Sequence, residues 1–490
     1  MEVKHKFHFY KKIYQNIPKI HWEAREVAKE LGLEKLRGKI GLYCGSSSSP
    51  AALPKYVMDA IIEANKTPVY PLSRVEDELR ELIKDLYGDD YDVAVTNTCE
   101  SALRVSYETL LVPPMMRKGD AYRARFILPY GEDLDFLAGY GRPFPPRYKH
   151  ILIDKSVSAG EFGVEAKSLT NLDALLVKLV GAKYEAHGIR YDICPLLTTT
   201  DAEKSYERFA KMADIHASEL SGFVSLGYDT PGYGMKEKAA NGAPKLMTLI
   251  SKLANEFEVP YIVDSASCLP IIGLGPKDIS TGADVMMWSM DKVARSTICG
   301  LMVGKEETML PIRKGCGVGG QRYGDPTSHY KAVFSFADPG RDSLIGLMAT
   351  MKVLKDKPEL FTKPIDKMHA IIEDEFKSFT PSRFRDDLII TKSYTFGGIE
   401  LNYEQTWHED EFGIPIFTMD DMYCNTNPIM SALDEMGVYP ATIYTGNSFI
   451  SPGLGTLDED GELIEEDTRL AVRALVRAIE IVCKHAGFVE

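Results

Sequence analysis

Cysteine is sparse in this sequence, and the eight cysteines among 490 residues include no CxxC pair. Such scattered spacing gives neither a disulfide framework nor a metal-binding motif, and it favours a reducing compartment, so we expect a cytoplasmic protein without a bound metal. The sequence also lacks an apolar run of the ~20 residues that span a bilayer. Its opening residues lack the apolar core of a signal peptide. We therefore expect no membrane association.

An excess of positive charge is also absent. Acidic side chains outnumber basic ones by 71 to 57, which gives a net charge of −14. Binding to nucleic acid normally needs a basic face, so we expect no nucleic-acid partner. What the chain does have is length and 44% hydrophobic residues, enough for a large core and more than one domain. This composition is typical of an ordinary soluble enzyme.

Helix and strand patterns alternate between residues 245 and 303. Lys245–Phe257 carries apolar residues at helical spacing. Three short apolar segments follow it, at Tyr261–Val263, Asp284–Trp288 and Gly300–Val303. This alternation predicts a mainly parallel sheet, which binds ligands at the carboxyl ends of its strands. Asp264 and Lys292 both lie at or just beyond such ends.

Lys292 and Asp264 have the chemistry of a site for pyridoxal 5′-phosphate (PLP). A lysine amine can form a Schiff base with the cofactor, and an aspartate can keep the pyridine nitrogen protonated so that the ring acts as an electron sink. Alone, a lysine at a strand end is usually a surface charge, and an aspartate there is often a helix cap. The order of the elements around the two residues makes the pair more specific.

A phosphate-binding turn is predicted upstream of this pair. Asp92–Thr96 has the pattern of a strand, and the following turn opens a helix whose N-terminus offers unpaired N–H groups and the positive end of the dipole. The Thr98 hydroxyl could instead simply cap this helix. We expect Thr98, Cys99 and Glu100 to bind the phosphate. The Ser289 hydroxyl and the Arg295 guanidinium could complete the phosphate site.

Four short motifs carry a resemblance to a known family. They are Val263-Asp-Ser-Ala-Ser-Cys-Leu-Pro270, Gly282-Ala-Asp284, Ser289-Met-Asp-Lys292 and Gly300-Leu-Met-Val-Gly304-Lys305. They resemble the fold-type I PLP-dependent enzymes, and within them the group that contains selenocysteine synthase and glucosaminate-phosphate ammonia-lyase. The likeness is specific from about residue 250 to 305 and looser over 75–110 and 330–360.

The resemblance implies an α/β fold with a large, mainly parallel seven-stranded sheet domain and a small α/β C-terminal domain. The expected divisions are an N-terminal arm and active-site lead-in (1–70), a large PLP-binding domain (71–360) with an insertion at about 113–220, and a small domain (361–490). Because enzymes of this fold build their sites across a dimer, at least a homodimer is implied. The resemblance makes Lys292 the Schiff-base residue and Asp264 the pyridinium partner. The expected cofactor-binding residues are Thr98, Cys99, Glu100, Ser158, Asp264, Ser267, Ser289, Lys292 and Arg295.

Two departures from the family pattern bear on the substrate. Ser158 stands roughly where many relatives stack a histidine on the cofactor ring. The stretch 441–450 lacks the arginine with which aminotransferases of this fold bind the substrate carboxylate. Arg322 or Arg341 could take that role, or the substrate is not a standard α-amino acid. Ser47 is a further substrate candidate, in a serine-rich segment (41–50) that has the composition of a flexible linker but could face the substrate.

We therefore expect a PLP-dependent lyase or β-replacement enzyme that acts on a small, anionic amino compound and needs no amino acceptor. Transamination, decarboxylation and cysteine desulfuration stay open, because the sequence does not reveal which bond at Cα is broken. Cys424 falls where desulfurases keep their sulfur-accepting cysteine, although the residues after it have the pattern of a helix cap. A tRNA-dependent selenium transferase is disfavoured by the acidic charge.

Overall fold

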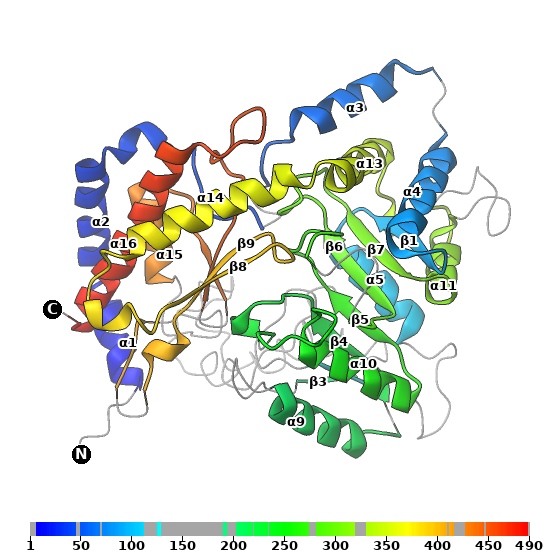
Figure 1. The fold of residues 1–490 in the computed structure, drawn as a ribbon, viewed down its shortest axis with the longest axis horizontal. Coiled ribbons are helices and arrows are strands. Elements are labelled where there is room, and N and C mark those ends of the chain that lie inside the picture. Colours follow the sequence, from blue (N-terminus) through cyan, green and yellow to red (C-terminus); the bar gives the residue numbers. More distant parts are fainter. Residues whose placement is uncertain are drawn as a thin grey trace, which may run out of the picture.

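The protein forms two β-sheets with helices packed around them (Figure 1). The computed structural model describes residues 6–45, 50–68, 71–111, 125–128, 190–193, 202–218, 220–233, 235–273, 281–318, 330–408, 411–415, 427–444 and 447–488. Within these ranges, no helix has the length and apolar character needed to cross a membrane.

The larger sheet has seven strands in the order β1-β7-β6-β5-β4-β2-β3. Their bounds are β1 Tyr91–Thr96, β2 Arg125–Leu128, β3 Arg190–Ile193, β4 Leu220–Leu226, β5 Tyr261–Asp264, β6 Val285–Ser289 and β7 Gly300–Lys305. Neighbours from β6 to β3 are parallel, whereas β7 is antiparallel to both β6 and β1. β1 therefore runs in the same direction as β6. The predicted seven-stranded, mainly parallel sheet is confirmed.

These strands are short apolar runs because both faces of the sheet are covered. All residues of β4, β5 and β6 are buried, as expected for strands between two layers. The flanking helices include α4 (Leu72–Tyr87), α5 (Cys99–Leu110), α10 (Lys245–Phe257) and α11 (Glu306–Cys316), which pack against the strands. α10 has the bounds predicted from its helical spacing.

The segment 113–220, expected to be an insertion, supplies part of the core. β2 and β3 lie in it, as does α9 (Ala202–Ile215), which packs against β2 and α10. β2 pairs in parallel with both β3 and β4. The segment is therefore not wholly an insertion, because without these two strands the sheet would end at β4.

A smaller unit is built around the four-stranded antiparallel sheet β10-β11-β9-β8. Its strands are β8 Ile389–Ser393, β9 Gly398–Asn402, β10 Thr442–Tyr444 and β11 Asn447–Ile450. Its helices are α14 Glu359–Phe376, α15 Pro428–Met436 and α16 Glu465–Ala486. α13 (Arg341–Asp356) precedes α14, and together they run from the large unit to the small one (Figure 1).

The N-terminal helices belong to this small unit instead of extending as an arm. α1 (Lys6–Gln15) packs on α16, and α2 (Ile17–Leu31) packs on both α15 and α16. In Figure 1 the blue and red helices lie side by side. The apolar face of α2 carries Ile20, Ala24 and Val27, all buried. This spacing forms one helical stripe, which needs a partner surface.

Residues 41–45, which have the composition of a flexible linker, are also buried. The Gly41 N–H donates to Leu454 O at 2.8 Å, and the Leu42 N–H donates to Tyr439 O at 3.1 Å. A Cβ at Gly41 would lie 2.8 Å from Tyr439 Cβ. Glycine is thus needed here for close packing, and the linker prediction is wrong for this stretch.

Glu400 on β9 lies where the two units meet. It is fully buried, and its Oε1 accepts from the Gly232 N–H of the large unit at 2.9 Å. Its Oε2 has no hydrogen-bond partner among the described atoms. Burial raises the pKa of Glu400 from its ordinary value of 4.5 to about 7. The carboxyl is therefore protonated in the folded protein at pH values where the unfolded chain has already released the proton.

This shift predicts a pH-dependent stability. Between pH 4.5 and about 7 the folded protein binds the extra proton, so the free energy of unfolding should fall as pH rises through this window. Glu400→Gln removes the titration while keeping an acceptor for Gly232. We expect this variant to exceed the wild type at pH 8 by at most about 3 kcal/mol, and to match it near pH 4.5. Urea unfolding at both pH values measures this. The exposed Glu459→Gln should change neither curve, and equal stabilities of wild type and Glu400→Gln at pH 8 would contradict the prediction.

Candidate active site

Four chain segments meet at one edge of the large sheet, which we call the carboxyl edge. β1, β5 and β6 end there, and β7 begins there because it runs in the opposite direction. The contact is close: a Cβ at Gly300 would lie 2.5 Å from Thr98 O and 2.6 Å from Thr96 Oγ1. The topology thus brings together residues that follow β1, β5 and β6 and are distant in sequence.

Asp264 ends β5 and is buried, with 3% of its surface exposed. Its Oδ1 accepts the Ala266 N–H at 2.9 Å and lies 4.0 Å from Cys99 Sγ at the start of α5. The turn after β5 is held to the end of β6, because the Ser289 N–H donates to Ala266 O at 3.1 Å. The carboxylate is therefore held at the carboxyl edge by the Ala266 N–H, within a turn that is itself hydrogen-bonded to β6.

Lys292 lies in the turn that joins β6 to β7. Its N–H donates to Ser289 O at 3.3 Å, and the residue is half-buried between buried neighbours. Burial and the charge of Asp264 raise the pKa of the Cys99 thiol well above its usual value, while the charge of Lys292 opposes this rise. Burial, Asp229 and Asp264 likewise raise the pKa of Cys268, again against Lys292.

The same two charges thus act on the same two buried thiols. Both thiols therefore lie within electrostatic range of Asp264, which ends β5, and of Lys292, which follows β6. The raised pKa values also keep both thiols protonated near neutral pH, so neither cysteine has the thiolate character of a nucleophile.

Thr98 is the N-cap of α5. Its Oγ1 accepts from the Ser101 N–H at 3.1 Å, so the capping role considered for this hydroxyl is present. The N–H groups of the first turn have no acceptor within the helix, because such groups are left over at every helix start. Cys99 is buried and the Glu100 side chain is exposed. An anion-binding helix terminus remains available here.

Tyr228 is a residue of this edge that the sequence analysis did not identify. It follows β4, is buried, and forms a hydrogen bond with Ser267. Burial, and after it the negative charges of Asp264 and Tyr43, raise the pKa of its phenol well above the usual value. The mostly apolar segment 223–226, between Gly222 and Gly227, was the available signal, since a residue just beyond this strand would share the carboxyl edge.

Ser267 and Ser289 hold neighbouring segments in place. The Ser267 hydroxyl donates to Gly45 O at 3.2 Å, which connects the buried 41–45 stretch to the turn after Asp264. The Ser289 hydroxyl donates to Asp291 Oδ1 at 2.6 Å, and Asp291 is 1% exposed. A phosphate role for Ser289 would therefore require this hydroxyl to leave Asp291.

The remaining candidates that the structure describes, Arg295 and Arg341, lie in two different places. Arg295 is buried, donates from Nη2 to Leu360 O at 3.2 Å and lies over the Phe361 ring, 4.9 Å from its centroid. The guanidinium of Arg341 donates to Asn65 Oδ1 at 3.2 Å and to Ala64 O, at the C-terminal end of α3 (Lys55–Lys66). The other candidates lie outside the described residues: Ser47, Ser158, Arg322 and Cys424.

The residues at the carboxyl edge fit PLP. A buried carboxylate needs a positive or hydrogen-bonding partner, which a protonated pyridine nitrogen would supply at Asp264. The start of α5 would take the phosphate, and the Lys292 amine would take the aldehyde carbon. Asp291 fits least well, because its buried Oδ2 has no hydrogen-bond partner in the described part of the chain. Over the same part, no cluster of metal-ligating side chains is present.

Gly300 provides a test of this assembly. Gly300→Ala would push against Thr98 O, so we expect it to lower the free energy of unfolding by about 1–3 kcal/mol and to weaken PLP binding roughly tenfold, the equivalent of about 1.4 kcal/mol. Gly304→Ala is the matched control, since its Cβ would meet Asp284 O at 2.3 Å at the other end of β7. It should cost stability without changing PLP affinity. Denaturant unfolding and cofactor titration separate the two effects, and unchanged PLP affinity in Gly300→Ala would disprove the link.

No protein-family model matches the sequence, and a sequence search of curated proteins gives no match. Three solved structures resemble the chain. The SepCysS–SepCysE N-terminal domain complex matches with 11% identity over 91% of this chain and 96% of the other, at a TM-score of 0.48. Ureidoglycine-glyoxylate aminotransferase from Bacillus subtilis matches with 12% identity over 91% and 93%, at 0.48.

D-Glucosaminate-6-phosphate ammonia-lyase matches with 12% identity over 94% of this chain and 99% of the other, at a TM-score of 0.44. These identities and TM-scores are low for all three structures. The functional assignment therefore depends on the sheet topology and on the residues at the carboxyl edge.

Proposed function

We propose that this protein is a PLP-dependent enzyme whose cofactor is bound at the carboxyl edge by Lys292. The observation that carries the proposal is the convergence of Lys292, Asp264 and the N-terminus of α5 at the point where β1, β5 and β6 end. If Lys292 were only a surface charge and Thr98 only a helix cap, there would be no reason for these three features to lie at the same edge.

Each residue has a separate task in this proposal. The Lys292 amine holds the cofactor and, once free, moves the proton at the substrate Cα. Asp264 holds a proton at the pyridine nitrogen, and its burial strengthens that charge pair. The first turn of α5 binds the phosphate through backbone N–H groups. When bound, PLP supplies an electron sink for negative charge that develops at Cα.

We further propose a lyase or β-replacement reaction on a small amino compound. In support, 441–444 and 447–450, the described parts of the small-domain stretch where aminotransferases carry their carboxylate-binding arginine, contain no arginine. The neutral state of Cys99 and Cys268 supports a role for both in excluding water, not in covalent catalysis. The proposal includes at least a homodimer, as the resemblance implies, which light scattering of the purified protein tests.

The test of the cofactor assignment is a titration of the purified protein with PLP. We expect a visible absorbance band, and borohydride should fix the cofactor onto a single lysine that peptide mapping places at Lys292. A label on another lysine, or no band at any PLP concentration, would refute the proposal.

The reaction class is tested with a panel of amino acids, with and without 2-oxoglutarate. For a lyase we expect release of ammonia or another leaving group together with a keto product, at a rate that does not depend on the acceptor. Turnover that requires 2-oxoglutarate would instead identify an aminotransferase, and it would leave the PLP assignment intact.

A further inference from the structure

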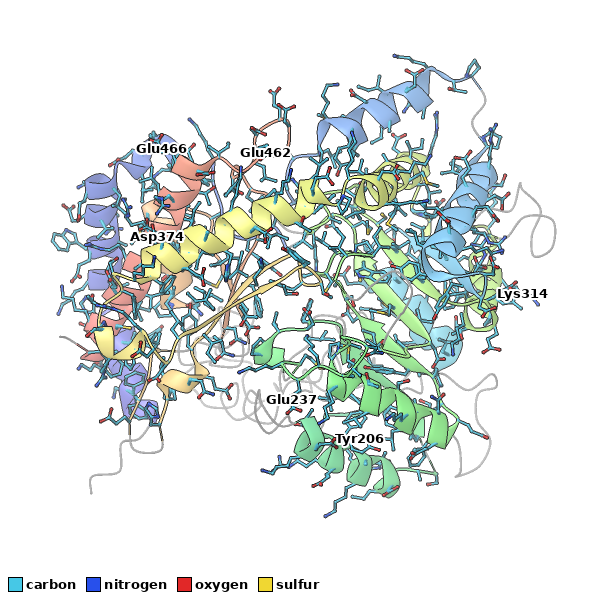
Figure 2. All side chains as sticks on the ribbon, in the orientation of Figure 1. Tyr206, Glu237, Lys314, Asp374, Glu462 and Glu466 are labelled. Carbon is cyan, nitrogen blue, oxygen red and sulfur yellow. The ribbon has the colours of Figure 1, made fainter. Side chains whose placement is uncertain are left out.

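A cavity of about 650 Å³ lies beside the turn that carries Lys292. Its walls are the segment Ala51–Ile62, which includes the start of α3, and the Gly453–Gly461 loop before α16, with Arg295 and Leu360 between them. Figure 2 labels Glu462, which directly follows that loop and pairs with Lys367 of α14 at 3.0 Å. The sequence analysis named Arg295 as a cofactor-binding candidate but did not identify this cavity.

Arg295 is an unusual residue in the wall of this cavity. It is 8% exposed, and among the described residues its guanidinium donates one hydrogen bond, to Leu360 O. Within the described residues, no carboxylate lies within ion-pair distance of its guanidinium. The polar groups that act on it are the Tyr56 phenol and the Cys44 thiol, and burial raises the pKa of both, so they stay neutral. Burying a guanidinium without an anion is costly.

The backbone of Arg295 is also strained. Its φ is +53°, in a region that residues other than glycine rarely adopt, and strain of this kind is concentrated at functional sites. The Arg295 N–H donates to Lys292 O at 2.9 Å, so both residues belong to one tight turn. The conformation that presents the lysine therefore also directs the arginine to the cavity wall.

The mouth of the cavity has the opposite charge. Asp458, Glu459 and Asp460 are exposed and line it, and Asp59 on α3 is paired with Lys55. The carboxylate of a monoacid would meet the positive charge of Arg295 inside the cavity. In a diacid, the second carboxylate would lie near the acidic side chains of the mouth. Like charges in such a position are repelled.

We propose that Arg295 binds the carboxylate of a small amino acid whose side chain is neutral or cationic. This inference rests on the proposed function, because it treats the cavity as the substrate's approach to Lys292. Arg295 then binds the substrate carboxylate from a different element than the 441–450 stretch, and the measurement with and without 2-oxoglutarate decides the reaction class. It also changes the expected substrate class, which the sequence analysis gave as an anionic amino compound.

The test measures anion binding by calorimetry to the PLP-loaded, full-length protein, with acetate, succinate and inorganic phosphate as probes. We expect acetate to bind, and succinate and phosphate to bind more weakly. Arg295→Met should weaken acetate binding about 10- to 100-fold, as expected for loss of a hydrogen bond to a charged group, and Arg295→Lys should restore part of it. Arg383→Met is the matched control, because Arg383 also lies over a phenylalanine ring, 4.6 Å from the Phe384 centroid.

A second variant tests the mouth without altering the buried turn. The double variant Glu459→Gln/Asp460→Asn should narrow the gap between acetate and succinate while leaving acetate affinity unchanged. Equal acetate binding in wild type and Arg295→Met, no acetate binding by the wild type, or tighter binding of phosphate than of acetate would each overturn the proposal.

The visible absorbance of each variant distinguishes this proposal from the proposed function. If the wild type shows no PLP band but binds acetate through Arg295, the result contradicts the proposed cofactor site and supports carboxylate binding by Arg295. An intact PLP band with Arg295-independent acetate binding counts against the cavity alone.

Discussion

Lys292→Ala is expected to abolish catalysis while leaving the fold intact. The substitution removes the amine that holds the cofactor and the group that moves the Cα proton, and general acid–base help alone is typically worth ~10²–10⁴ in rate. We therefore expect at least a ~10³-fold loss, measured as product release with the best substrate of the amino-acid panel. The half-buried position of the side chain, in a turn held by backbone hydrogen bonds, makes large unfolding unexpected.

Lys305→Ala is the matched control for this experiment. Lys305 ends β7 and is exposed, and since β7 is antiparallel to β6, it lies at the edge opposite Lys292. Its loss should change neither the rate nor borohydride labelling. If Lys292→Ala kept wild-type activity, or if Lys305→Ala lost it, Lys292 would not be the catalytic lysine.

Asp264→Asn is expected to have the second largest effect. The amide keeps the size of the side chain and an acceptor for the Ala266 N–H, but it cannot hold a proton at the pyridine nitrogen through a charge pair. Hydrogen bonds to charged groups contribute about 1.5–3 kcal/mol, so the rate should fall roughly 10- to 100-fold while PLP remains bound. Rate and PLP affinity are measured on the same preparation.

Asp284→Asn serves as the comparison, because Asp284 precedes β6 at the opposite edge and accepts the Tyr261 N–H at 2.8 Å. This acceptor survives the substitution, and activity should be retained. A near wild-type rate for Asp264→Asn would assign the pyridinium role to another residue, whereas loss of PLP would make Asp264 a binding residue and not an electronic one.

Local patterns predicted the large sheet well where strands are short, apolar and bounded by charged or glycine residues. β5 extends the predicted strand 261–263 by one residue, and α10 has the predicted bounds. The grouping of Lys292, Asp264 and Thr98 was also predictable, because the carboxyl ends of parallel strands share an edge. No side-chain detail is needed for that inference.

Close packing between distant segments was not predictable from local patterns. Gly41 belongs to a glycine- and serine-rich stretch, yet its lack of a Cβ serves contact with Tyr439, almost 400 positions later. Composition alone cannot distinguish a glycine that flexes from one that packs. The surroundings of Arg295 were not predictable for the same reason. Its guanidinium lies beside Leu360, Phe361 and Tyr56, which are distant in sequence and carry no carboxylate.

The antiparallel β7 strand has a consequence for how the site is assembled during folding. β6, the lysine turn and β7 form a hairpin from neighbouring residues, which needs no long loop to close. The pairing of β7 with β1 instead joins Thr96 and Gly300, which are 204 residues apart. The lysine half of the site can thus exist before the phosphate half docks. A cofactor that contacts both halves binds only the state in which β1 is paired with β7. By mass action it therefore stabilises this long-range pairing.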